Sequence, residues 1–396
     1  MQGLIITNSF GVDQLTDMKK IYYLAYYDIE ENQEEHRNFV LSAANKISYI
    51  INALEKLGFS VEVVSASQTL NKTAYSEKVI PIGNQSKLRL FKTLPWGNKF
   101  RRIISLLYQR KQIYNFLVKR VTKEDIVLVY HSLSYLKLLK KAKRTVGFKL
   151  LLEVEEIYSD VTNNPKVYKK EMELFKVADA YLFPTELLNK KVNTEGKPHV
   201  IIYGTYNVER KITERFNDGR VHCVYAGTFD PRKGGGAAAA AAGYFLDEKY
   251  HIHILGFGSE KDKKLLIDTI EDVNRKSKCK VTYDGLLSGE AYIRFIQSCH
   301  IGLSTQNPNA AFNLTSFPSK VLSYLANGLR VVSIKILALE ESRIGDILYY
   351  YNDPNPIKIA ETICSIDFED EYDSRQVVKK LDVEFLANMQ KLLGDE

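Results

Sequence analysis

Apolar residues along this chain follow two alternating rhythms. Short runs rich in β-branched and aromatic residues, bounded by glycine, proline or charged residues, are typical of buried strands. Between these runs lie longer segments in which apolar residues recur every three or four positions, which is the period of an amphipathic helix. The alternation predicts an α/β protein with parallel sheets and right-handed crossover connections. Because 396 residues exceed one ordinary hydrophobic core, we expect two domains.

The first half of the chain predicts a Rossmann-like domain over residues 1–206. A strong helical period covers residues 38–57 and ends at Gly58. A basic, apolar helical segment is expected within residues 94–120. The strands are expected at residues 1–7, 19–27, 59–65, 126–130, 150–154, 180–183 and 200–203.

The second half predicts a second Rossmann-like domain over residues 220–365, joined by a polar, non-periodic linker at residues 207–219. Its tail, residues 366–396, is acidic and then helical, and we expect it to pack back on the first domain. Strands are expected at residues 221–226, 251–255, 280–283, 301–304, 330–334 and 346–351, and helices at 237–246, 261–274, 289–297 and 356–365.

Residues 316–334 combine a helix start, a glycine stop and a buried strand. Ser316 is a plausible N-cap, Pro318 is expected in the first turn, and Gly328 stands where a left-handed residue ends the helix. The free backbone N–H groups at such a helix start, together with Lys320, offer a site for an anion. The stretch therefore predicts a phosphate site.

The net charge of +7 is concentrated in one segment. Residues 78–123 contain twelve Lys or Arg and no Asp or Glu, so the remainder carries 7 − 12 = −5. One interpretation is a core helix with a solvated face; the other is docking on an anionic membrane surface. No nucleic-acid fold signature accompanies the charge, so no nucleic-acid partner is expected. The residues proposed for acceptor and membrane contact are Trp96, Lys99, Arg101 and Arg102.

The composition is that of a soluble globular protein, and we expect it to stay in the cytoplasm. No apolar run approaches the length of a membrane span, and the first residues lack the pattern of a signal peptide. The cysteines show no C-x-x-C spacing, so we expect reduced, buried thiols rather than disulfides or a zinc site. They are Cys223, Cys279, Cys299 and Cys364.

Two polar residues follow strands of the first half. His131 comes directly after residues 126–130, and Glu155 follows residues 150–154. Because ligands of open parallel sheets bind outside the carboxyl ends of the strands, both are candidate catalytic residues. A hydrogen-bonded loop histidine and a solvated glutamate are the alternative interpretations.

Four motifs give the second half a resemblance to the donor domain of GT-B glycosyltransferases, in particular the retaining group 1 or family 4 enzymes. They are YAGT at residues 225–228, DPRKG at 230–234, LGFGSE at 255–260 and FPSKVL at 317–322, followed by Gly328. The first half is similar, mainly in architecture, to glycosyltransferases of bacterial capsule and exopolysaccharide assembly.

The resemblance implies two Rossmann-like domains facing across a cleft and a nucleotide-sugar donor. Arg232 and Lys233 would stabilise the departing diphosphate, and His131 would lie beside the transferred sugar. Retention of anomeric configuration, no cofactor and no metal are implied; the chain has no Asp-x-Asp motif to hold one. The donor-binding residues would be Gly227, Thr228, Gly256, Phe257, Gly258, Ser316, Phe317, Pro318, Ser319, Lys320 and Ser323.

One departure from the family concerns two glutamates eight residues apart, the second of which holds the ribose hydroxyls. The corresponding residues here are Thr315 and Ser323. A serine hydroxyl binds a ribose hydroxyl more weakly than a carboxylate does. This departure leaves open a catalytically silent GT-B subunit as an alternative.

The sequence thus predicts a glycosyltransferase that moves a sugar from a nucleotide-sugar to a lipid-linked or other glycan acceptor in surface polysaccharide synthesis. The first domain would bind the acceptor and the inner face of the plasma membrane, with Glu155 positioning the acceptor hydroxyl. A GT-B nucleotide-sugar 2-epimerase is a further alternative, and it would convert the donor without an acceptor. The sugar, the base, the linkage and the oligomeric state stay open.

Overall fold

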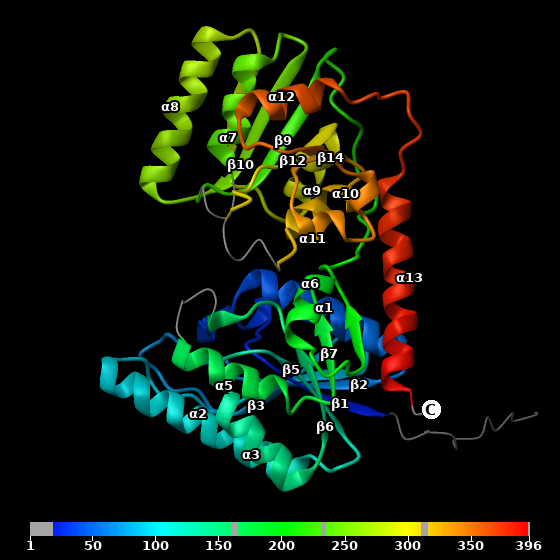
Figure 1. Ribbon diagram of the computed structural model, residues 1–396. Coiled ribbons are helices and arrows are strands. Elements are labelled where there is room, and N and C mark those ends of the chain that lie inside the picture. The colour runs from blue at the N-terminus through cyan, green and yellow to red at the C-terminus, as the bar shows by residue number, and fades with distance from the viewer. Residues whose placement is uncertain (1–18, 160–164, 231–234, 310–315, 395–396) are drawn as a thin grey trace, which may run out of the picture.

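A computed structural model describes residues 19–159, 165–230, 235–309 and 316–394, and these form two α/β domains stacked one above the other (Figure 1). The strand expected at residues 1–7 lies outside the described residues. Each domain is built around one mainly parallel sheet. Within the described residues no helix is both long and apolar enough to cross a membrane.

The N-terminal sheet has eight strands in the order β3-β4-β2-β1-β5-β6-β7-β8, all parallel except the antiparallel pair β3 and β4. The strands are β1 (Lys20–Ala25), β2 (Ser60–Ser65), β3 (Lys78–Ile82), β4 (Ser86–Leu90), β5 (Ile126–Tyr130), β6 (Lys149–Glu153), β7 (Ala180–Phe183) and β8 (His199–Ile201). The β3–β4 hairpin was not predicted. Its positive charges were interpreted as a surface for a partner, although its residues also alternate as in a strand.

Alternate residues of the N-terminal strands face different helices, so both faces of the sheet are buried, as parallel sheets require. Ile21 and Tyr23 of β1 pack with α1 (Leu41–Lys56), whereas Tyr22 and Leu24 pack with the layer formed by α2, α3 and α5. The other helices of this domain are η1 (Glu30–Glu35), α2 (Lys99–Arg120), α3 (Leu136–Val146), α5 (Pro165–Phe175) and α6 (Glu186–Val192).

The C-terminal sheet is wholly parallel, in the order β11-β10-β9-β12-β13-β14. Its strands are β9 (Val221–Thr228), β10 (Tyr250–Phe257), β11 (Lys280–Gly285), β12 (Ile301–Ser304), β13 (Arg330–Ile334) and β14 (Tyr349–Tyr351). Its helices are α7 (Gly236–Ala241), η2 (Ala242–Phe245), α8 (Glu260–Lys276), α9 (Gly289–Ser298), α10 (Ser319–Ala326), α11 (Leu337–Glu340), η4 (Gly345–Ile347) and α12 (Pro356–Cys364).

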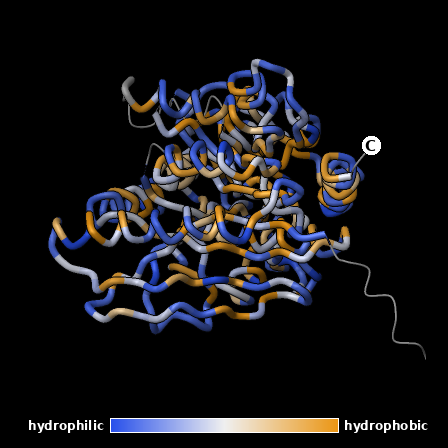
Figure 2. Tube along the Cα trace, turned by 90° about the horizontal axis from the view of Figure 1, so that it is seen from below, coloured by the Kyte–Doolittle hydropathy of each residue, from blue (hydrophilic) through white to orange (hydrophobic). Residues whose placement is uncertain are grey.

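The last helix, α13 (Ser374–Leu393), runs alongside both domains (Figure 1). Figure 2 looks nearly along its axis and shows hydrophobic and hydrophilic positions on its circumference. The ring of Phe385 packs against Tyr49 and Tyr206 at centroid distances of 5.6 and 6.2 Å, and Tyr49 donates a 2.5 Å hydrogen bond to Asp382. Helix α13 therefore joins the C-terminal domain to α1 of the N-terminal domain. Residues 207–219 contain no helix or strand.

The cysteine prediction needs one correction. Cys223, Cys279 and Cys299 are free and buried, but Cys364 is exposed. It lies at the last position of α12, on the outside of the domain.

Candidate functional site

The C-terminal sheet reverses its strand order between β9 and β12, and a crevice lies at the carboxyl ends of β9 and β10. Ligands of open α/β sheets bind at this kind of switch point. Gly227 and Thr228 end β9, Gly256 and Phe257 end β10, and α10 begins nearby. The structure therefore brings together, at one end of the sheet, the described residues predicted to bind a donor.

One of the glycines, Gly256, is required by the close approach of β9 and β10. Gly227 and Gly256 are partners in the strand register, and Gly256 has φ +133°. A Cβ on Gly256 would lie 1.8 Å from the carbonyl oxygen of Gly227, a distance that no side chain could tolerate. The glycine at position 256 is thus required by the pairing of β9 with β10.

Lys320, in the first turn of α10, is the cation of this crevice. Its Nζ lies 4.4 Å from the centre of the Tyr225 ring and 3.4 Å from the Tyr225 hydroxyl. Burial lowers the pKa of Lys320 from its ordinary value to about 8. Within the described part of the chain no carboxylate forms an ion pair with Lys320, so its charge is available to an anion from solution.

Beside Lys320 lies a hollow of about 190 Å³ with a largely apolar lining. Its lining residues are Ala226, Gly227, Leu255, Gly256, Phe257, Leu286, Leu287 and Tyr292. The Tyr292 hydroxyl lies 3.2 Å from Ser323 Oγ, so two hydroxyls stand together beside the hollow. Tyr292 was not predicted as a site residue, because a tyrosine on a helical face is normally a core residue.

The predicted start of α10 is wrong by two residues. The helix begins at Ser319, its N-cap is Pro318 without a side-chain cap, and Ser316 is not the N-cap. The chain stays extended through Pro318 because Phe317 stacks on Tyr203 of the N-terminal domain, with ring centroids 4.8 Å apart. Gly328 has φ +85° and ends the helix as predicted.

Three residues singled out by the sequence lie outside the described residues: Arg232 and Lys233, the pair predicted to bind the diphosphate, and Thr315. Their predicted roles are therefore neither supported nor opposed by any contact.

On the N-terminal side, His131 follows β5 and is buried. Its Nε2 lies 2.6 Å from Glu171, and its Nδ1 is buried without a hydrogen-bond partner. Although burial opposes it, hydrogen bonds from His131 and Ser159 hold the pKa of Glu171 below its ordinary value. Glu171 thus fixes the orientation of the imidazole, a contact with no sequence signal because the two residues are 40 positions apart.

Glu155 belongs to a polar cluster behind β6. Lys46 of α1 forms an ion pair with Glu155, and it also lies 4.0 Å from Glu153 Oε1. Tyr23 donates a hydrogen bond to the other oxygen of Glu153. Burial raises the pKa of Glu153 well above its usual range, although Lys46 opposes the shift. Glu155 is partly exposed, whereas Glu153 is fully buried.

The basic segment divides into two parts. Lys78, Lys87 and Arg89, on β3 and β4, are neutralised by ion pairs with Glu35, Glu62 and Glu77. The positive charge attributed to this segment is therefore smaller than its composition predicts.

The other part, on α2, is exposed. Lys99, Arg101 and Arg102 alternate with outward-facing apolar side chains, and Arg102 lies over the Trp96 ring at 4.4 Å. The exposed apolar side chains are Phe100, Ile103, Ile104 and Leu107. This combination of cations and exposed apolar groups is the amphipathic surface referred to below as the α2 surface.

Comparison with known proteins gives matches only among solved structures: no family model and no curated protein matches. E. coli trehalose-6-phosphate synthase, OtsA, bound with UDP-2-fluoro glucose has a TM-score of 0.66 and 11% identity, with 94% of this chain and 97% of that chain covered. HepE from Anabaena in complex with UDP has a TM-score of 0.63 and 10% identity over 94% and 99% of the two chains. The lipopolysaccharide outer core galactosyltransferase WaaB has a TM-score of 0.60 and 14% identity over 94% and 99%.

The chain has the GT-B fold. The two-domain α/β architecture predicted from the strand and helix pattern is thereby confirmed. The similarity covers both domains and the C-terminal helix, because each alignment spans nearly the whole of both chains.

Proposed function

We propose that this protein is a metal-independent, retaining glycosyltransferase that takes a sugar from a nucleoside diphosphate donor. The observation that carries the proposal is Lys320, a half-buried cation at the switch point of the C-terminal sheet that has no carboxylate partner among the described residues. Placing a charge there is costly unless an anion compensates it. The solved GT-B structures with UDP-2-fluoro glucose and with UDP are consistent with a diphosphate as that anion.

The roles follow from the chemistry of the leaving group. Departure of a nucleoside diphosphate places negative charge on its oxygens, and Lys320 and the backbone N–H groups of α10 would stabilise that charge. Arg232 and Lys233 would act with them. The hollow beside Gly227 and Gly256 would take the base, and the hydroxyls of Tyr292 and Ser323 would bind the ribose.

The N-terminal domain would supply the acceptor side. His131, held by Glu171, is proposed to lie beside the transferred sugar, and Glu155, held by Lys46, to position the acceptor hydroxyl. The α2 surface is proposed to dock on an anionic membrane, which favours a lipid-linked glycan acceptor and a role in surface polysaccharide synthesis. The protein would then be peripheral on the inner face of the plasma membrane.

A donor screen tests the proposal directly. Thermal shift and calorimetry with UDP-, GDP- and dTDP-sugars should reveal one class that stabilises the protein, because a ligand that binds only the folded state raises its melting temperature. Absence of binding by every donor would leave only the catalytically silent GT-B subunit. Conversion of the bound donor without any acceptor would identify the epimerase instead.

Donor affinity is expected to depend on pH through Lys320. Because burial places its pKa at about 8, the side chain is protonated below pH 8 and binds the diphosphate in that form. Affinity should be constant near pH 7 and fall by up to about tenfold per pH unit above 8. Calorimetry with the donor from pH 6.5 to 9.5 measures this, and an unchanged dissociation constant at pH 9.5 would contradict the role of Lys320.

Tyr292→Phe is expected to weaken donor binding about 2- to 10-fold, which corresponds to loss of one net hydrogen bond of roughly 0.5–1.5 kcal/mol. The melting temperature should change little, because Ser323 Oγ is partly exposed and water can replace the lost partner. Tyr244→Phe is the matched control: its hydroxyl bonds Asp272 of α8 and contacts no residue of the hollow named above. Equal affinity of Tyr292→Phe and the wild type would exclude Tyr292 from ribose binding.

A further inference from the structure

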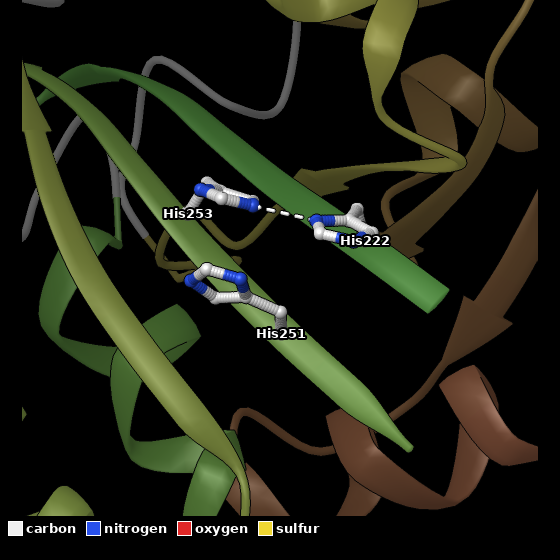
Figure 3. A group of neighbouring side chains, drawn as sticks. All are labelled: His222, His251 and His253. Atoms are coloured by element: carbon white, nitrogen blue, oxygen red, sulfur yellow. Dashed lines mark hydrogen bonds between the residues drawn. The ribbon is translucent and has the colours of Figure 1, made fainter. Parts of the chain in front are cut away.

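Three histidines of the C-terminal domain meet on one face of the sheet, away from the donor crevice (Figure 3). His222 lies on β9, and His251 and His253 lie on β10, where alternate positions share a face. His222 and His251 are register partners. One nitrogen from each residue lies within 4.8 Å of the others, and all three residues are buried.

The outer nitrogen of each ring has an oxygen partner. His222 Nε2 lies 2.9 Å from Asp218, and His253 Nδ1 lies 3.1 Å from Asp284. Carboxylates accept hydrogen bonds, so both of these nitrogens carry the proton.

His251 Nε2 lies 3.0 Å from the Thr282 hydroxyl, which itself donates to Asp284 at 2.9 Å. Since the hydroxyl proton is used on Asp284, His251 Nε2 is the donor of this contact. All three imidazoles therefore hold their proton on the outer nitrogen. Their lone pairs lie on the inner nitrogens, which face one another (Figure 3).

This arrangement leaves the contact between the inner nitrogens of His222 and His253 without the proton that a hydrogen bond needs. His222 Nδ1 lies 2.8 Å from His253 Nε2, although neither nitrogen holds a proton when both rings are neutral and both outer nitrogens donate. Two lone pairs at this distance repel unless both nitrogens bind one cation, either a proton shared between them or a metal ion to one side of the pair. An extra proton would bridge His222 and His253 only, whereas a metal ion would bind both of these nitrogens and the inner nitrogen of His251.

We infer that His222, His251 and His253 form a site for one divalent transition-metal ion, with Zn²⁺ the preferred occupant. Neutral imidazole is a ligand that zinc favours, and three protein ligands leave a fourth position for water. Such sites also require groups that hold the ligand rings in position. That role falls to Asp218, Asp284 and Thr282, which bond the outer nitrogens and orient the rings.

The site would be structural with respect to sugar transfer. His222 precedes Thr228, at the donor crevice, by six residues, which is roughly 20 Å along a strand. Asp218 belongs to the interdomain linker, and Phe216 of the same linker packs on the His222 ring at 4.4 Å. A bound metal would therefore hold the linker against the first strands of the donor domain.

Untagged protein, stripped with a chelator and dialysed, tests the inference by titration with Zn²⁺ and then Co²⁺. The expected result is one equivalent of zinc by elemental analysis, a raised melting temperature, and visible absorption bands of low-symmetry Co²⁺. Failure of the wild-type protein to bind zinc at micromolar concentration would overturn the inference.

Two substitutions distinguish a metal ion bound by the cluster from an extra proton held there. His251→Asn removes one metal ligand but leaves the Asp218-His222-His253-Asp284 contacts in place, so zinc binding should fall at least tenfold. His300→Asn is the matched control: His300 Nδ1 accepts from the backbone of His222 but is not a proposed ligand, and zinc binding should persist. If His251→Asn binds zinc as tightly as the wild type, the cluster holds a proton and not a metal.

Discussion

Replacing Lys320 with methionine is expected to weaken donor binding by roughly 30- to 150-fold and, at the same time, to make the unliganded protein more stable. The loss of affinity corresponds to about 2–3 kcal/mol, the range for a hydrogen bond to a charged group. Methionine keeps the length and the apolar stem that packs on Tyr225 but carries no charge. Calorimetry with the donor found by the screen measures the first effect.

The gain in stability follows from the sign of the pKa shift. The pKa of Lys320 is lowered to about 8 in the folded protein, so the charged form is disfavoured by folding, and this penalty is present below pH 8. The penalty disappears as pH rises from about 8 toward the ordinary lysine value. After allowing for partial exposure and for the lost cation–π contact, we expect the variant to gain about 1–2 kcal/mol at pH 7.

A residue that only supports the fold would behave in the opposite way, losing stability when replaced. The matched control is Lys276→Met, which removes an exposed lysine of α8 that pairs with Asp272. We expect it to change neither donor affinity nor the melting temperature appreciably. If Lys320→Met binds the donor normally, the diphosphate does not lie at the start of α10.

The sequence predicted the parallel elements well because their signals are local. A buried run such as residues 126–130 and a helix ended by Gly328 carry their own period and stop. The β3–β4 hairpin was missed for a physical reason: its lysines and arginines are paired with Glu35 and Glu62, and those partners come from sequence positions that no local pattern connects. The composition of the segment therefore overstated the charge that β3 and β4 offer to a partner.

The candidate site shows the same division. Lys320 could be predicted from the helix start, but its position over Tyr225 depends on β9 and α10 meeting across the sheet. The start of α10 was mispredicted because the stacking of Phe317 on Tyr203 is a contact between domains. The resemblance implied that Gly256 binds the donor, and the structure shows that its neighbouring strand requires a glycine there.

The histidine cluster had a signal that went unused. The sequence HIHIL places His251 and His253 on one face of a strand, and this alternation predicts adjacent imidazoles. What no sequence pattern contains is the register that sets His222 opposite His251. Strand pairing over a separation of 29 residues is determined by packing, so only the structure identifies His222 as the third proposed ligand.

The α2 surface carries the second large prediction. Phe100 and Leu107 have exposed fractions of 70% and 57%, and basic residues lie beside them on the same helix. Exposed apolar groups of this size are unfavourable in water and become favourable once they enter a lipid interface, at roughly 1.5–3 kcal/mol each. The double variant Phe100→Glu, Leu107→Glu is therefore expected to lose at least about 100-fold in affinity for anionic vesicles.

Sedimentation with vesicles of phosphatidylglycerol and phosphatidylcholine measures this loss. Val383→Glu is the matched control, since Val383 of α13 is also exposed, at 66%, but lies away from the α2 surface. High salt should weaken binding of the wild type, because the cations of α2 act through screened electrostatic attraction. Equal binding to neutral vesicles would instead assign the attraction to the apolar side chains alone. No loss in the double variant would show that the apolar face of α2 does not dock on the membrane.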